Sequence, residues 1–215
     1  RFRAAGMPER ETIFYEWTDG QCFLIPREPA VYLDLPGVLN NFAGRAAPYA
    51  TLEAIERHPN GHHNIFLVQP NVDLQNDWDD FATVGDVLRV RPVAPTSADV
   101  QRGETLTIHL GMRLSQPLRE GYRFFVHLQG DPTPYEGGTL WSTGDAPLCS
   151  LASSETAIGD RTLVQTLTLP IPADLPAGEY HAAIGLYDPA TNERLPLQTP
   201  SGETRYYDAL HFIVE

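Results

Sequence analysis

The chain has 215 residues, of which 42% are hydrophobic and 20% are charged, a globular balance that excludes an intrinsically disordered chain. Its net charge of −13 repels phosphate backbones, and its 15 basic residues are all arginines scattered along the sequence, so nucleic acid is excluded as a partner. The longest apolar runs have four residues. A membrane helix needs about 20, so we expect no membrane span in this chain.

The first seventy residues predict a small α+β unit made of short elements. Strands over Thr12–Trp17 and Gln21–Ile25 flank Asp19-Gly20, and Asp-Gly favours a tight hairpin turn. A further strand is predicted over Ala30–Leu33, and apolar residues at helical spacing predict a short helix over Gly37–Arg45. The core of such a small unit is marginal, so we expect it to pack on its neighbour.

A second hairpin and a polar segment complete this region. The runs Thr51–Arg57 and Asn64–Gln69 flank Pro59-Asn60-Gly61, and Asn-Gly between two apolar-bearing runs indicates a hairpin. Leu52–Arg57 also suits a short helix, and its periodicity does not decide between the two. Asn71–Thr83 is rich in Asp and Asn, which predicts a linker or the first edge segment of the next domain.

The second half of the chain has the clearest pattern. Apolar and polar residues alternate in runs rich in β-branched and aromatic side chains, and clusters of turn-forming residues separate these runs. The predicted strands are Val87–Arg91, Thr105–Leu110, Tyr122–Leu128, Arg161–Pro170, Glu179–Tyr187, a short piece at Arg194–Leu197, and Leu210–Val214. The sequence therefore predicts a mainly-β chain, with an immunoglobulin-like antiparallel β-sandwich over residues 76–215 preceded by the small α+β unit over residues 1–75.

Several segments resemble a recurrent bacterial sequence pattern. They are Gln21–Pro26 with Ala30–Leu33, Asp80–Asp86, Gly121–Leu128, Leu175–Tyr180, Ile184–Thr191 and Arg194–Pro196. The pattern is found in the extracytoplasmic C-terminal region of multi-span membrane glycosyltransferases of the protein-mannosyltransferase and aminoarabinose-transferase type. The resemblance is firmest after residue 80.

This resemblance implies a location and a set of neighbours for the chain. It implies an extracytoplasmic, cell-surface position, with the chain tethered to or docked on a membrane protein. The catalytic acids of such transferases lie in loops between membrane helices, and that part is not in this sequence, so we expect this chain not to be an enzyme. The sequence begins without Met or an apolar leader, and we expect it to be a piece of a longer protein.

Two polar segments are candidate metal sites. His58, His62 and His63 surround the predicted turn, and two imidazoles facing each other across a hairpin can begin a zinc or nickel site. Asp77 and Asp79 belong to an oxygen-rich loop that suits Ca²⁺, although its spacing is not that of an EF-hand. A solvated hairpin tip and a solvated acidic linker explain the same residues. We therefore expect no cofactor, with Ca²⁺ as the alternative.

The segment from Tyr135 to Trp141 is a candidate ligand-binding loop. It is a long excursion between strands with two large aromatic side chains and two glycines, and functional residues concentrate on loops. Sugar rings stack on exposed aromatic faces, so the loop predicts carbohydrate binding. The alternative is that Trp141 folds back and caps the core of the sandwich.

Cys22 and Cys149 are the two cysteines of the chain. A disulfide between them would tie the N-terminal region to the sandwich, and an even number of cysteines permits it. Two buried free thiols are the alternative.

No catalytic motif stands out, because the sequence has neither a Gly-x-Ser-x-Gly elbow nor a nucleotide-binding glycine loop. His109, His127, His181 and His211 lie within predicted strands, where one face of the sandwich explains them. We expect a non-catalytic accessory domain whose partner is a protein or a cell-surface glycan. A carbohydrate-binding module and a structural subunit with pairing sheet edges are the alternatives.

Overall fold

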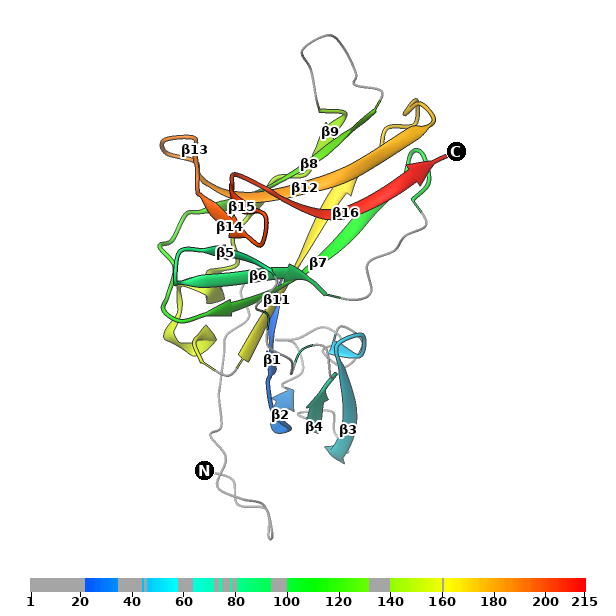
Figure 1. The fold of residues 1–215 in the computed structure, drawn as a ribbon. Helices are drawn as coiled ribbons and strands as arrows, with labels where there is room; N and C mark the ends of the chain where they lie inside the picture. Colours follow the sequence, from blue (N-terminus) through cyan, green and yellow to red (C-terminus); the bar gives the residue numbers. More distant parts are fainter. Residues whose placement is uncertain are drawn as a thin grey trace.

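The computed structural model describes residues 22–34, 46–57, 64–71, 81–93, 100–131, 140–159 and 161–215, together with Gly44, Leu74 and Trp78. These residues form two large antiparallel β-sheets packed face to face and a third, three-stranded sheet beside them (Figure 1). The predicted mainly-β antiparallel sandwich is confirmed. Its immunoglobulin-like type stays a prediction. No described helix is long and apolar enough to cross a membrane.

The first layer of the sandwich is a seven-stranded sheet with the strand order β1-β11-β7-β6-β5-β14-β15. Its strands are β1 (Cys22–Pro26), β5 (Ala82–Val84), β6 (Leu88–Pro92), β7 (Thr105–Leu114), β11 (Arg161–Pro170), β14 (Leu197–Thr199) and β15 (Gly202–Thr204). The predicted strands from residue 87 onward are confirmed in both layers, except for the piece at Arg194–Leu197, which is divided between β13 in one sheet and β14 in the other. The three-residue strands β5 and β15 were too short to predict from alternation.

The second layer is a six-stranded sheet in which β8 and β12 form the centre. Its strands are β8 (Arg123–Asp131), β9 (Ser142–Thr143), β10 (Ala146–Pro147), β12 (Gly178–Asp188), β13 (Glu193–Arg194) and β16 (Tyr207–Val214). Two short 3-10 helices, η1 (Ser150–Ser153) and η2 (Glu155–Ala157), lead from this sheet back to β11 in the first layer.

Strict alternation of side chains along the long strands builds the core between the two layers. In β7, Leu106, Ile108, Leu110, Met112 and Leu114 all point inward and are at most 4% exposed. The inward residues of the facing strands β8 and β12 belong to the same apolar cluster. Because a shift of one residue would expose a whole row, this pattern fixes the register of each strand.

Strand β1 is buried on both of its faces. Cys22 and Leu24 belong to the core between the layers, while Phe23 and Ile25 belong to a second apolar cluster on the outer side of the same sheet. All four residues are at most 2% exposed. An edge strand with two apolar faces needs a cover on its outer side.

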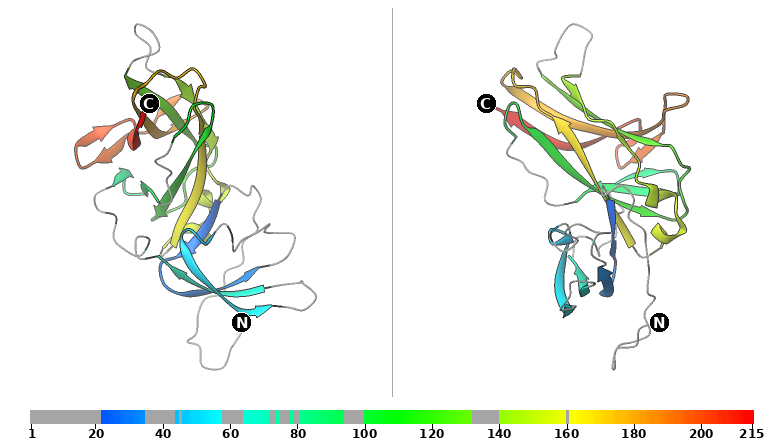
Figure 2. Two further views of the ribbon diagram at one scale, coloured as in Figure 1. Left: turned by 90° about the vertical axis from the view of Figure 1, so that its right-hand side faces the viewer. Right: turned by 180° about the vertical axis from the view of Figure 1, so that it is seen from behind.

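The three-stranded sheet provides this cover. Strands β2 (Ala30–Asp34), β4 (Asn64–Pro70) and β3 (Ala50–Arg57) pair in that order, and their inner residues Phe66 and Val68 lie in the cluster with Phe23 and Ile25. The Tyr32 hydroxyl of β2 donates a hydrogen bond of 2.8 Å to the Leu24 carbonyl of β1. Figure 2 shows the small sheet against one end of the sandwich, with β1 between them.

This arrangement differs from the predicted organisation in one respect. Residues 22–26 fall within the predicted unit 1–75, yet they pair along their full length with Arg161–Gln165 of β11.

The predicted hairpin over residues 51–69 has its two strands, β3 and β4, so the helical alternative for Leu52–Arg57 is wrong. The predicted elements at Thr12–Trp17 and over most of Gly37–Arg45 lie outside the described residues.

The segment predicted as a solvated linker contributes buried residues to the second cluster. Leu74 and Trp78 are 2% and 0% exposed. The Trp78 ring has the Arg113 guanidinium 4.2 Å from its centroid, and its edge reaches the backbone of Gly111 in β7. A Cβ at position 111 would lie 2.8 Å from the Trp78 ring, so the glycine makes room for the tryptophan. Such close approach is a common reason for glycine within a strand.

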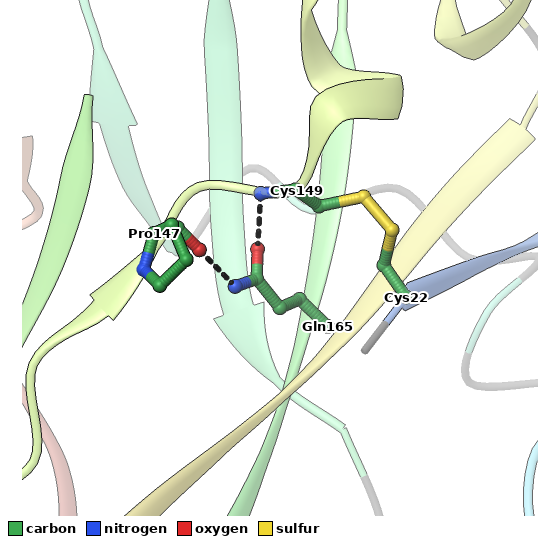
Figure 3. Close-up of a disulfide and its surroundings, with 4 residues drawn as sticks. All are labelled: Cys22, Pro147, Cys149 and Gln165. Carbon is green, nitrogen blue, oxygen red and sulfur yellow. Dashed lines mark hydrogen bonds between the residues drawn. A yellow bond between two sulfur atoms is a disulfide. The ribbon is translucent and has the colours of Figure 1, made fainter. Parts of the chain in front are cut away.

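A disulfide joins Cys22 in β1 to Cys149 beside η1, with Cα atoms 6.1 Å apart. Figure 3 shows the neighbouring Gln165 side chain, which is fully buried in β11. Its Oε1 accepts a hydrogen bond of 3.0 Å from the Cys149 amide, and its Nε2 donates one of 2.8 Å to the Pro147 carbonyl. The buried amide therefore holds the chain segment that carries Cys149 in place against β11.

We expect Cys22→Ser/Cys149→Ser to lower the free energy of unfolding by about 2–5 kcal/mol, because the bridge closes a long loop in the unfolded chain. Urea unfolding followed by tryptophan fluorescence measures this difference. Reductant should destabilise the wild-type chain by a similar amount and leave the double variant unchanged. Equal stability of the oxidised wild type and the double variant would contradict a structural role for the bridge.

Candidate functional site

Most of the predicted site residues lie outside the described part of the chain. These residues are His58, His62, His63, Asp77, Asp79 and Tyr135. The zinc and calcium sites therefore stay predictions. Among the described residues, no three His, Cys, Asp or Glu side chains are grouped so that they could hold a metal ion.

Trp141, the described aromatic of the predicted binding loop, lies against the core. Its ring meets the ring of Tyr180 edge to face, with centroids 6.2 Å apart, and its amide donates a hydrogen bond to the Leu128 carbonyl. Tyr180 is 2% exposed. This contact favours the alternative in which Trp141 covers the sandwich core.

The outer face of the six-stranded sheet has the most distinctive group of polar and aromatic side chains. Arg123 of β8, Tyr187 of β12 and Arg194 of β13 are register partners on three adjacent strands, so they form one row across the sheet. Their inward neighbours Phe124 and Leu186 lie in the core, which places the row on the outer face. We call these three residues the arginine–tyrosine row.

Phe125 forms the apolar floor beside this row. It is 3% exposed although it points away from the core. Its ring lies over Gly185, where an added Cβ would come within 2.4 Å of the ring. The guanidinium of Arg194, on β13, lies 4.4 Å from the centroid of the Phe125 ring. Phe125 is thus enclosed between a glycine and an arginine, an arrangement that cation–π attraction favours.

Arg205 extends the positive charge of the row. Its Nη1 donates a hydrogen bond of 3.1 Å to the Arg194 carbonyl. Within the described residues, Arg123, Arg194 and Arg205 have no carboxylate partner. Arg119, by contrast, is paired with Asp188 at the end of β12.

His127 lies next to Phe125 on this face and is 8% exposed, with the two ring centroids 4.7 Å apart. Burial lowers the pKa of His127, and the positive charge of Arg194 lowers it further, while Asp145 acts in the opposite direction. Asp145 also accepts a hydrogen bond of 3.1 Å from the Tyr187 hydroxyl. The electrostatic effect of Arg194 on this face is therefore only partly offset by Asp145.

A pair of stacked histidines lies further along the same face. The rings of His181 in β12 and His211 in β16 have centroids 5.5 Å apart. His181 Nε2 lies 3.1 Å from Gln129 Oε1 and 3.5 Å from Asp208 Oδ1. The pair is a polar continuation of the face toward the edge strand β16.

His109 occupies a different position, on the outer face of β7 under the small sheet. Its ring meets the buried Tyr49 ring edge to face at 5.6 Å, and its Nδ1 lies 3.2 Å from Thr166 Oγ1. Burial lowers the pKa of His109. This histidine belongs to the junction between the sandwich and the small sheet.

No protein-family model matches the sequence, and no significant relative is found among curated proteins. The outer face of the six-stranded sheet is therefore chosen as the candidate site from its own residues alone. The arginine–tyrosine row could not be recognised in the sequence, because its members come from three strands that only register brings together. The signal that the sequence did contain was that Arg123 and Tyr187 occupy outward positions in two predicted strands whose apolar and polar residues alternate.

We expect the free energy of unfolding to decrease as the pH falls below about 6.5, the ordinary histidine value. The pKa values of His109 and His127 are lowered in the folded chain, so below this pH the unfolded chain binds more protons. Urea unfolding between about pH 5 and pH 8 measures this dependence. His109→Gln/His127→Gln should flatten it, and a double variant with the full wild-type slope would disprove the assignment.

Proposed function

We propose that this chain is a non-catalytic extracytoplasmic accessory domain that belongs to, or docks on, a membrane glycosyltransferase-like protein. Its role is recognition, either of a partner domain or of the polymer being modified. The sandwich is the scaffold, and the outer face of the six-stranded sheet is the recognition surface.

The observation that carries this proposal is the position of the segments with the family resemblance. Gly121–Leu128 contains most of β8, Ile184–Thr191 contains the end of β12 and the following turn, and Arg194–Pro196 begins in β13. The register brings these three segments side by side. Each segment supplies one member of the arginine–tyrosine row, so the resemblance converges on one surface as well as on one scaffold.

The disulfide supports the extracytoplasmic location. Cys22 and Cys149 come from distant parts of the sequence and are buried at 1% and 2% exposure. Structural disulfides form and persist in oxidising compartments such as the periplasm and the cell surface. A bridge that attaches an edge strand to the core is a structural one.

The open reading frame that encodes this chain provides the test. We expect it to encode several membrane-spanning segments before Arg1, or to lie beside a gene for a multi-span glycosyltransferase whose product binds the purified domain. Protein exported to the periplasm should contain no titratable thiol. A reading frame without membrane spans, together with no binding to the neighbouring transferase, would contradict the proposal.

The edge strand β16 favours a second candidate function, a subunit of a cell-surface assembly. Within the described residues, β16 pairs with β12 alone, so its other edge has no strand partner. Ile213 on this strand is 67% exposed. An unprotected edge strand is a template for pairing with another chain.

Sedimentation velocity over a range of concentrations distinguishes this candidate. An assembly subunit should self-associate as its concentration rises, and Ile213→Asp should shift the equilibrium toward the monomer. Thr107→Asp on the outer face of β7 is the matched control, because it adds the same charge away from β16. A chain that stays monomeric throughout would contradict the assembly function.

A further inference from the structure

The three arginines beside Tyr187 are unusual in such an acidic chain. Acidic residues outnumber arginines by 28 to 15 in the sequence, so a group of arginines without carboxylate partners is not what the composition leads us to expect. Arg123, Arg194 and Arg205 have none as a partner among the described residues, and two of them, Arg194 and Arg205, are exposed. Three guanidinium groups without a carboxylate partner, set against the single carboxylate of Asp145, leave this part of the face locally positive.

The geometry of the row gives this surface a defined width. Adjacent strands lie about 4.8 Å apart, so the Cα atoms of Arg123 and Arg194, two strands apart, are separated by roughly 10 Å. Tyr187 stands between them and is partly exposed. Its hydroxyl is held by Asp145, which fixes the side chain on this face.

Arg194 is itself held in place. It lies over Phe125, whose ring rests on Gly185, and its backbone carbonyl accepts the hydrogen bond from Arg205. An arginine positioned in advance loses less conformational entropy when it binds a ligand. The surface therefore has at least one positioned cation, Arg194, for anion recognition.

We propose that the arginine–tyrosine row, with Arg205, binds an acidic saccharide, whose sugar ring packs on Tyr187 and whose carboxylate is held by the flanking arginines. The planar guanidinium fork matches a carboxylate with two parallel hydrogen bonds. The aromatic ring between the arginines is what favours a sugar over an inorganic anion or an acidic peptide, since it offers an apolar face. The choice of a saccharide rests on the proposed function, because the domain would then contact the polymer that its transferase modifies.

Isothermal titration with an oligogalacturonate, a chain of carboxylate-bearing sugars, tests this proposal on the full 215-residue chain. We expect measurable binding that weakens about tenfold or more in Arg123→Gln and in Arg194→Gln, because each loses a charge-assisted hydrogen bond. Tyr187→Ala should weaken it as well. Arg89→Gln, which removes the same charge from β6 in the other sheet, should bind like the wild type.

Three comparison ligands identify what the site recognises. A neutral maltooligosaccharide of equal length should not bind. Polyglutamate of equal charge and inorganic phosphate should bind more weakly than the oligogalacturonate, and their weak binding should not depend on Tyr187. Polyglutamate that binds as tightly, or phosphate that displaces the saccharide at equal concentration, would overturn the assignment to a sugar.

A nuclear magnetic resonance titration of His127 gives an independent readout. A carboxylate bound beside Arg194 offsets the positive charge that lowers the pKa of His127, so saturation with the oligogalacturonate should raise that pKa. Arg194→Gln should raise it without ligand. An unchanged His127 titration at saturation would overturn the proposed location.

The failure of this inference and the failure of the proposed function can be told apart. A reading frame that encodes a membrane transferase, with no binding of any acidic saccharide, would overturn the saccharide site alone. Binding that depends on the row, in a chain without any membrane transferase, would overturn the accessory function alone.

Discussion

The burial of β1 on both faces is the constraint on which the rest of the structure depends. A strand of four apolar residues at the edge of a sheet is stable only if something covers its outer side, and the small sheet provides Phe66 and Val68 for this purpose. The hydroxyl of Tyr32 and the bridge from Cys22 then hold the strand in place. The small sheet and the sandwich therefore pack against opposite faces of the same strand, and β1 contributes residues to both apolar clusters.

On the outer face of each large sheet, an aromatic ring packs closely against a glycine. Gly111 admits the ring of Trp78 on one sheet, and Gly185 admits the ring of Phe125 on the other. In both places an arginine lies over the aromatic ring that the glycine admits. Each outer face thus has an aromatic ring packed on the sheet, Trp78 or Phe125, with an arginine guanidinium above the ring. At Gly111 this arrangement holds Trp78 against the sheet, and at Gly185 it holds Phe125 beneath Arg194 on the face that we propose for recognition.

The sequence predicted the long strands well because apolar and polar residues alternate over much of their length, most clearly in the first half of β7 and the second half of β11. It did not predict that residues 22–26 pair with β11, because an apolar run of this length has no period and its partner lies far along the chain. It also did not predict the arginine–tyrosine row, since Arg123, Tyr187 and Arg194 become neighbours only through strand register. Local patterns specify elements, whereas shared surfaces depend on pairing.

The pairing of β1 with β11 has a consequence for the order of folding. Pro26 pairs with Arg161, so β1 cannot pair until most of the chain has been synthesised. Contacts between such distant residues slow folding, and β3 and β4 can pair long before that point. The apolar strand Cys22–Ile25 therefore stays unpaired for most of the time that the chain takes to emerge, and during that time it is the segment most exposed to aggregation.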